Sequence, residues 1–131
     1  MKVLGVAVGG ALGAVLRWWL GEVFPDGTGF PWTTFTINVT GAGVLAGLPA
    51  LAAVRRSPGL AAALGPGVLG GFTTLSTYSD QTRALLADDQ VATAAGYVLG
   101  TLAACLVVVT LVGRSTTAQE RDEFEAEGGD E

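Results

Sequence analysis

Long uncharged runs of apolar residues, separated by short charged segments, dominate the pattern of this chain. No Asp, Glu, Lys or Arg occurs within residues 27–54, 57–79 or 90–113. Each run exceeds the roughly 20 residues that a helix needs to cross the hydrocarbon core of a bilayer. A shorter run, 3–16, continues past Arg17 into two tryptophans that suit the membrane interface. The pattern predicts an all-α membrane protein with four transmembrane helices, over residues 2–21, 32–54, 58–86 and 90–113.

Composition supports a single membrane domain. The chain has 131 residues, 50% of them hydrophobic, and a mean hydropathy of +0.50. Lys2 followed by apolar residues also resembles a secretory signal, but Arg17 and the tryptophans stand where a cleavage site would need small residues. We therefore expect a retained first helix and one transmembrane domain over residues 1–113.

The net charge of −5 belongs mainly to the C-terminal segment, because seven of the twelve acidic residues follow Arg114. This composition predicts an acidic, disordered tail over residues 114–131. The chain has no basic stripe interleaved with aromatic residues, so the sequence does not indicate a nucleic-acid partner.

The third uncharged run contains the most informative feature of the chain. Gly70 and Gly71 are followed by a series of hydroxyl side chains over residues 73–79, where a membrane helix would favour Leu and Val. Polar or non-helical backbone at membrane depth persists only where protein or a water-filled path surrounds it. The segment therefore predicts a helix broken in mid-membrane, beside an ion or substrate site.

Other polar groups within the apolar runs are further candidates. Asn38 is either an interhelical hydrogen-bonding group or a donor to an anion. Tyr97, Thr101 and Cys105 follow at i, i+4 and i+8, which places them on one helical face, although Thr hydroxyls commonly bond back to the i−4 carbonyl. No acidic residue is expected at mid-membrane depth in helices two to four, which disfavours a proton-coupled exporter.

Three motifs carry a resemblance to a known family. Residues 9–17, GGALGAVLR, resemble the GGxxGAxxR opening of the Fluc/CrcB fluoride channels. Residues 34–41, TFTINVTG, are similar to that family's GTxxVNxxG segment. Residues 70–79, GGFTTLSTYS, resemble its GGFTTFSTFS signature. The likeness covers residues 5–113 in order and leaves the acidic tail outside.

The resemblance implies an antiparallel dimer of four-helix subunits, with two fluoride pathways along the interface and a structural sodium ion at its centre. The sodium ligands would be the backbone carbonyls of Gly70 and Thr73. The fluoride pathway would be lined by Asn38, Thr74, Leu75, Ser76, Thr77, Tyr78, Tyr97, Thr101 and Cys105, with Arg17 and Gly71 in structural roles.

Two departures from the family pattern affect the pathway. The signature places phenylalanines where this chain has Leu75 and Tyr78, and Leu75 has no ring edge to face an anion. Cys105 stands where a serine is usual and is a weaker donor.

The resulting prediction is a passive, fluoride-selective channel subunit of the cell membrane that exports cytosolic fluoride and lowers its toxicity, and is not an enzyme. The alternatives are a partner or non-conducting subunit of a heterodimeric fluoride channel and, in a different transport class, a small multidrug-type exporter. Lys and Arg are concentrated on one side of a four-helix arrangement, which predicts cytoplasmic termini and leaves both homodimer and heterodimer open.

Overall fold

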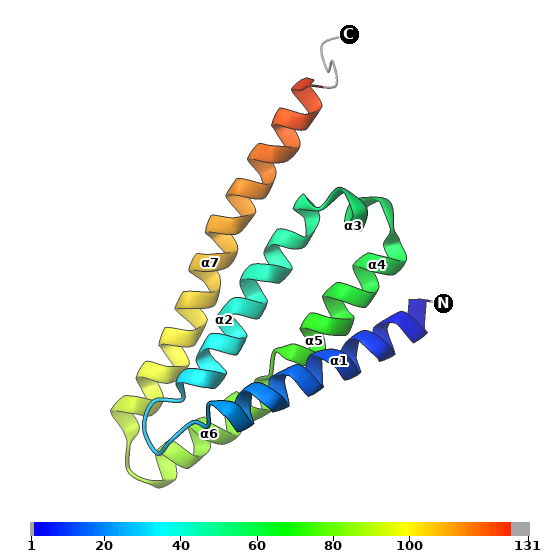
Figure 1. Ribbon diagram of the computed structural model, residues 1–131. Coiled ribbons are helices and arrows are strands. Elements are labelled where there is room, and N and C mark those ends of the chain that lie inside the picture. The colour runs from blue at the N-terminus through cyan, green and yellow to red at the C-terminus, as the bar shows by residue number, and fades with distance from the viewer. Residues whose placement is uncertain (1, 127–131) are drawn as a thin grey trace.

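Helices make up all the regular structure of the described chain, as the sequence predicts. The computed structural model describes residues 2–126, with side chains through residue 115 (Figure 1). The elements are α1 (Lys2–Val23), α2 (Trp32–Gly47), the 3₁₀ turn η1 (Leu48–Ala50), α3 (Ala52–Arg56), α4 (Pro58–Ala62), the π-helical η2 (Ala63–Leu69), α5 (Gly70–Phe72), α6 (Leu75–Ala87) and α7 (Val91–Ala126).

Three helical stretches of the described residues are long and apolar enough to cross a membrane. They are Lys2–Val23, Pro58–Ala87 and Val91–Ser115. The second helix, expected over 32–54, is shorter as an α-helix and ends at Gly47. Pro49 follows in η1, where it lacks an amide proton and cannot continue an α-helix, and Leu51 is extended before α3 begins.

The fourth helix, expected to end at residue 113, continues to Ala126. The backbone of residues 114–126 is therefore helical, where the composition predicted a disordered tail. An existing helix extends without the cost of nucleation, and Ala, Gln, Glu and Arg in this segment are good helix formers. The rest of the predicted tail, 127–131, lies outside the described residues.

The helices pack as two pairs. α1 lies along η2 and α5, and α2 lies along α7. Glycine permits the first contact, because a Cβ at Gly13 would collide with the carbonyl oxygen of Val68, and a Cβ at Gly71 with that of Gly10. Small residues allow such close backbone approach in membrane helices.

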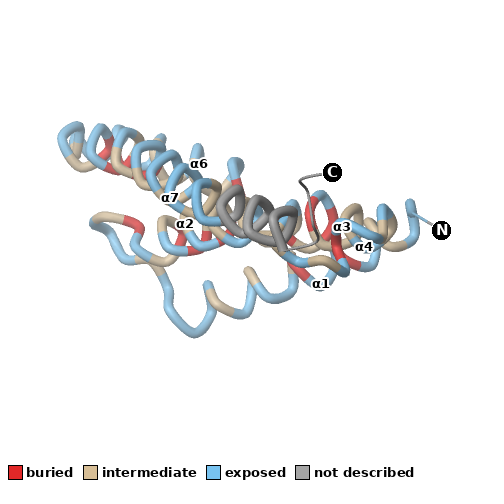
Figure 2. Tube along the Cα trace, turned by 90° about the horizontal axis from the view of Figure 1, so that it is seen from above, coloured by how far each residue is buried: buried red, intermediate tan, exposed pale blue. Residues whose placement is uncertain are grey.

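Buried residues are few and follow the seams between helices (Figure 2). Tyr97 is the largest wholly buried side chain, and it packs with Leu85 and Ala94 where α6 meets α7. Large apolar side chains such as Trp18 and Leu99 point outward, as expected for a surface that contacts lipid.

Candidate functional site

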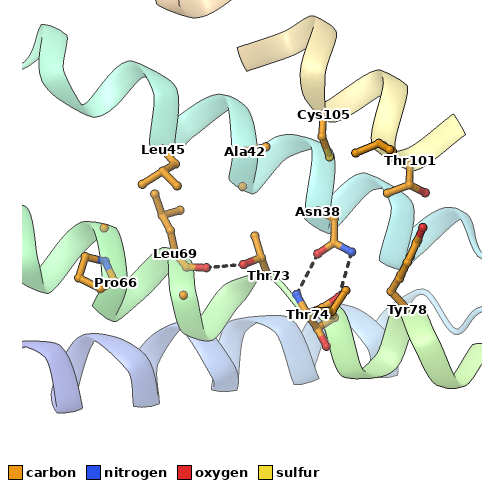
Figure 3. Close-up of a pocket in the computed structure, with 15 residues that line it drawn as sticks. Asn38, Ala42, Leu45, Pro66, Leu69, Thr73, Thr74, Tyr78, Thr101 and Cys105 are labelled. Carbon is orange, nitrogen blue, oxygen red and sulfur yellow. Dashed lines mark hydrogen bonds between the residues drawn. The ribbon is translucent and has the colours of Figure 1, made fainter. Parts of the chain in front are cut away.

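The helical path from Pro58 to Ala87 is interrupted at Thr73 and Thr74, whose backbones are extended. The side chain of Asn38 in α2 spans this interruption (Figure 3). Its Nδ2 donates to the Thr74 carbonyl at 3.1 Å, and its Oδ1 accepts from the Thr74 amide at 2.8 Å. Asn38 thus satisfies both backbone groups of Thr74 and retains a second N–H of its own.

The same contacts free two carbonyl groups. In a continuous α-helix the amide of Thr74 would donate to the Gly70 carbonyl, and the amide of Thr77 to the Thr73 carbonyl. The first amide donates instead to Asn38, and the second donates to the Thr74 hydroxyl at 3.1 Å, which caps α6. The carbonyls of Gly70 and Thr73 therefore lose their α-helical donors.

The hydroxyl groups after the interruption bond to one another. The Thr74 hydroxyl donates its proton to Thr77 Oγ1 at 3.0 Å, and Ser76 Oγ lies 3.2 Å from Thr74 Oγ1. Because the Thr74 proton is already used, Ser76 is the donor of that second contact. The Thr77 hydroxyl retains a proton of its own.

A cavity of about 710 Å³ lies beside the interruption, between α2, η2, α6 and α7. Its wall is largely aliphatic, and Leu75 at its edge is 76% exposed. Eight of the predicted site residues line it: Asn38, Gly70, Thr73, Thr74, Leu75, Tyr78, Thr101 and Cys105. Ser76, Thr77, Tyr97, Arg17 and Gly71 are not among its lining residues.

Thr101 is the unusual group of this cavity wall. Its side chain is buried at 5% exposure, and its Oγ1 has no hydrogen-bond partner. By contrast, Thr110 in the same helix bonds back to the i−4 carbonyl of Leu106 at 2.7 Å. A buried hydroxyl left unbonded costs stability, so its retention needs another explanation.

The two tyrosines are engaged elsewhere. The Tyr78 hydroxyl donates to the Val98 carbonyl at 3.1 Å, which leaves the ring rather than the hydroxyl toward the cavity. The Tyr97 hydroxyl donates to Gln81 Oε1 at 2.9 Å. The predicted stripe on the fourth helix is thus divided, with Thr101 and Cys105 at the cavity and Tyr97 in a separate network.

That network includes residues that sequence reasoning missed. Asp26, in the loop after α1, accepts from the amides of Thr33 (2.7 Å) and Thr34 (3.1 Å), from the Thr34 hydroxyl (2.8 Å) and from Gln81 Nε2 (3.0 Å). Burial alone would raise the pKa of Asp26, but these hydrogen bonds outweigh it and hold the pKa below its ordinary value. One signal was available, since Pro31 at the N-cap of α2 has no side-chain donor or acceptor to cap the helix.

A second cavity, of about 260 Å³, adjoins this network. Arg17, Asp26, Thr77 and Gln81 are among its lining residues, and Thr74 lines both cavities. Arg17 Nε donates to the Gly71 carbonyl at 3.2 Å, so Arg17 tethers α1 to α5 just before the interruption.

The fold and the site define a helical membrane protein. Its polar side chains line a mostly apolar cavity beside one interrupted helix. The chain belongs to the family described as "CrcB-like protein, Camphor Resistance (CrcB)", whose model matches residues 4–114. This confirms the family that the three sequence motifs indicated.

Curated relatives named "Fluoride-specific ion channel FluC" are similar over most of their length. The chain is 43% identical over 113 residues to FluC 2 of Nocardia farcinica, covering 83% of this chain and 80% of the relative. It is 46% identical over 101 residues to FluC of Rhodospirillum centenum (73% and 79%) and 41% identical over 115 residues to FluC of Shewanella amazonensis (84% and 91%). The family is one of fluoride ion channels rather than enzymes.

Proposed function

We propose that this chain is the subunit of a passive, fluoride-selective channel that releases cytosolic fluoride across the cell membrane. Four spans would cross the bilayer, with α2 and η1 as the second and with the interruption at Thr73 and Thr74 in mid-membrane. The names of the relatives support fluoride as the permeant ion.

The proposed route follows the larger cavity. A small anion that leaves water must find donors to replace its hydration. The second N–H of Asn38, the buried and unbonded hydroxyl of Thr101 and the thiol of Cys105 belong to residues that line a mostly aliphatic wall. The edge of the Tyr78 ring adds a weak positive potential. No proton transfer is required, and flux would follow the electrochemical gradient of fluoride.

An antiparallel dimer would complete the site. The cavity is open on one face of the single chain, and a second subunit would cover it. The carbonyls of Gly70 and Thr73, freed from their α-helical donors, are hard oxygen ligands that fit a sodium ion. Two carbonyls from each subunit would hold that ion at the dimer centre.

The observation that carries this proposal is the unbonded, buried Thr101 hydroxyl at the cavity wall. Thr101→Val keeps the shape and removes the donor, so it should lower fluoride efflux from liposomes while stability stays the same or rises. Thr110→Val, which removes a lipid-side hydroxyl of the same helix, is the matched control. Unchanged efflux in Thr101→Val would remove this hydroxyl from the route, and a wild-type chain that releases no fluoride would overturn the function of this chain as a channel on its own.

The second candidate is a partner subunit that conducts only beside a related, oppositely oriented chain. Two observations favour it. Leu75 lacks the ring that the family signature places there, and the two ends of the helical bundle differ in charge. Efflux from liposomes that contain this chain alone separates the two candidates.

A further inference from the structure

A chain of hydrogen bonds joins the loop after α1 to the buried Tyr97 in α7. Gln81 in α6 is the central link, since its Nε2 donates to Asp26 Oδ2 at 3.0 Å and its Oε1 accepts from the Tyr97 hydroxyl at 2.9 Å. Asp26 and Gln81 line the smaller cavity, whereas Tyr97 lies behind them, fully buried, with its ring centroid 5.0 Å from that of Tyr78.

The ionised carboxylate of Asp26 determines which group donates and which accepts in each hydrogen bond of this series. An ionised carboxylate only accepts, so the amide of Gln81 must turn its NH₂ group toward Asp26. Its oxygen then faces Tyr97, and Tyr97 must donate its only hydroxyl proton to it. The low pKa of Asp26, held down by four hydrogen bonds, keeps the carboxylate ionised at neutral pH.

We propose that Asp26 is a positioning residue for the fluoride route. It acts by keeping the Tyr97 hydroxyl as a hydrogen-bond donor to Gln81. The inference rests on the proposed channel function. Tyr97 packs against Tyr78, whose ring lines the larger cavity. Tyr97 stays behind this wall, so a released hydroxyl proton would add a positive dipole one ring away from the route, and a conducting pore must bind its ion weakly enough to release it.

The variant Asp26→Asn tests this directly. Its Oδ1 can still accept from the Thr33 amide. Its NH₂ group takes the place of the oxygen that accepts from Thr34 and Gln81, so it gives up the Thr34 bonds but lets Gln81 turn over and donate to the Tyr97 oxygen, which frees the Tyr97 proton. We expect the half-saturating fluoride concentration and the maximal current in planar bilayers to fall together, each by roughly threefold to tenfold, the range of one neutral hydrogen bond. Simple structural damage would lower the current without tightening fluoride binding.

A second substitution distinguishes this positioning role from a role as a helix cap alone. In the double variant Asp26→Asn, Gln81→Glu the carboxylate moves to position 81. It accepts from the NH₂ group at position 26 and from the Tyr97 hydroxyl, so Tyr97 is again a donor. We expect both the current and the half-saturating concentration to return toward wild type. If Asp26 served only as a helix cap, a change at Gln81 would not compensate for its loss, and failure of the double variant to recover overturns the inference.

Whether the Tyr97 hydroxyl donates or accepts a hydrogen bond can also be measured without a flux assay. The chain has two tyrosines, so a Tyr78→Phe background isolates Tyr97 in an ultraviolet resonance Raman spectrum, whose ring doublet distinguishes a donating from an accepting hydroxyl. Asp26→Asn should change this spectrum, and Glu22→Gln, which removes another carboxylate at the smaller cavity, should not. An unchanged spectrum in Asp26→Asn overturns the inference, whereas a wild-type chain without fluoride current overturns the function of this chain as a channel on its own.

Discussion

Replacing Asn38 by Asp tests the interruption of the third span most sharply. The two side chains have the same size, so size alone would predict an intact fold. The structure predicts otherwise, because Nδ2 of Asn38 donates to the Thr74 carbonyl at 3.1 Å and a carboxylate cannot donate. The variant would lose that bond, leave a carbonyl unpaired and place a negative charge against it. We expect a loss of about 2–3 kcal/mol in stability, the upper part of the range for an unsatisfied buried group.

Acidic pH should reverse the defect. A protonated carboxyl at position 38 has the same outline as the amide, with an oxygen that accepts from the Thr74 amide and an O–H that donates to its carbonyl. Burial in an apolar wall disfavours the ionised form of the new carboxyl more than the unfolded chain does. The folded state then binds the proton more tightly, so stability rises as the pH falls. Fluoride flux, blocked at neutral pH by like-charge repulsion, should recover over the same interval.

Fluoride efflux from liposomes and thermal unfolding in detergent, both followed from pH 7.5 to about pH 5, measure these effects. Empty liposomes and the wild-type chain at each pH correct for hydrogen fluoride that crosses the lipid directly. Normal flux and stability of Asn38→Asp at neutral pH would show that Asn38 neither bridges the interruption nor lies on the route. A neutral-pH defect that acid leaves unchanged would refute the protonation argument.

Three further outcomes are expected. Gly13→Val should lower thermal stability by about 1–3 kcal/mol or prevent assembly, because its side chain would meet the Val68 carbonyl. Thr74→Ala should cost about 1 kcal/mol through loss of the α6 cap on the Thr77 amide, whereas Thr74→Ser should restore most of it, as read from detergent melting curves. If the missing ring at Leu75 weakens the route, Leu75→Phe should raise fluoride efflux from liposomes, and equal or lower efflux would contradict that role.

The sequence singled out residues 70–79 because their signals are local. Gly70 and Gly71 with the hydroxyls after them are contiguous, and lipid tolerates such a segment only under strict conditions. Asn38 was identified as a candidate for the same reason, since a lone amide in an apolar run is conspicuous. Its partner was not predictable, because the contact with Thr74 joins residues 36 apart.

Other parts of the site depended on three-dimensional packing. The helical spacing placed Tyr97 and Thr101 on one face. In the structure, however, the Tyr97 hydroxyl donates to Gln81, and the Thr101 hydroxyl is unbonded. The sequence did not single out Asp26, because no local pattern indicates that a loop residue accepts four hydrogen bonds from two helices.

The distribution of charge over the two ends of the bundle predicts a single orientation in the membrane. One end, where α1 begins and α3 and the span of α7 end, has basic residues and no acidic ones among residues 2–115. The opposite end has an ion pair, Arg83 with Asp80 at 2.8 Å, and a surplus of acids. Arg17 belongs to neither end, because it bonds to the Gly71 carbonyl beside the interruption. The basic end contains Lys2, Arg55, Arg56 and Arg114, and the acids of the other end are Glu22, Asp26, Asp80, Asp88 and Asp89.

Positive charge near the ends of membrane spans is retained on the cytoplasmic side, so the basic end and both termini should face the cytoplasm. In a Cys105→Ser background, Gly27→Cys reports on the acidic end and Ala53→Cys on the basic end, both at exposed or open positions. On intact cells that express only this chain, an impermeant thiol reagent should label the first site and leave the second unlabelled. A single orientation would then require an oppositely oriented partner chain for an antiparallel channel. Comparable labelling of both sites would instead show dual insertion, and the homodimer would suffice.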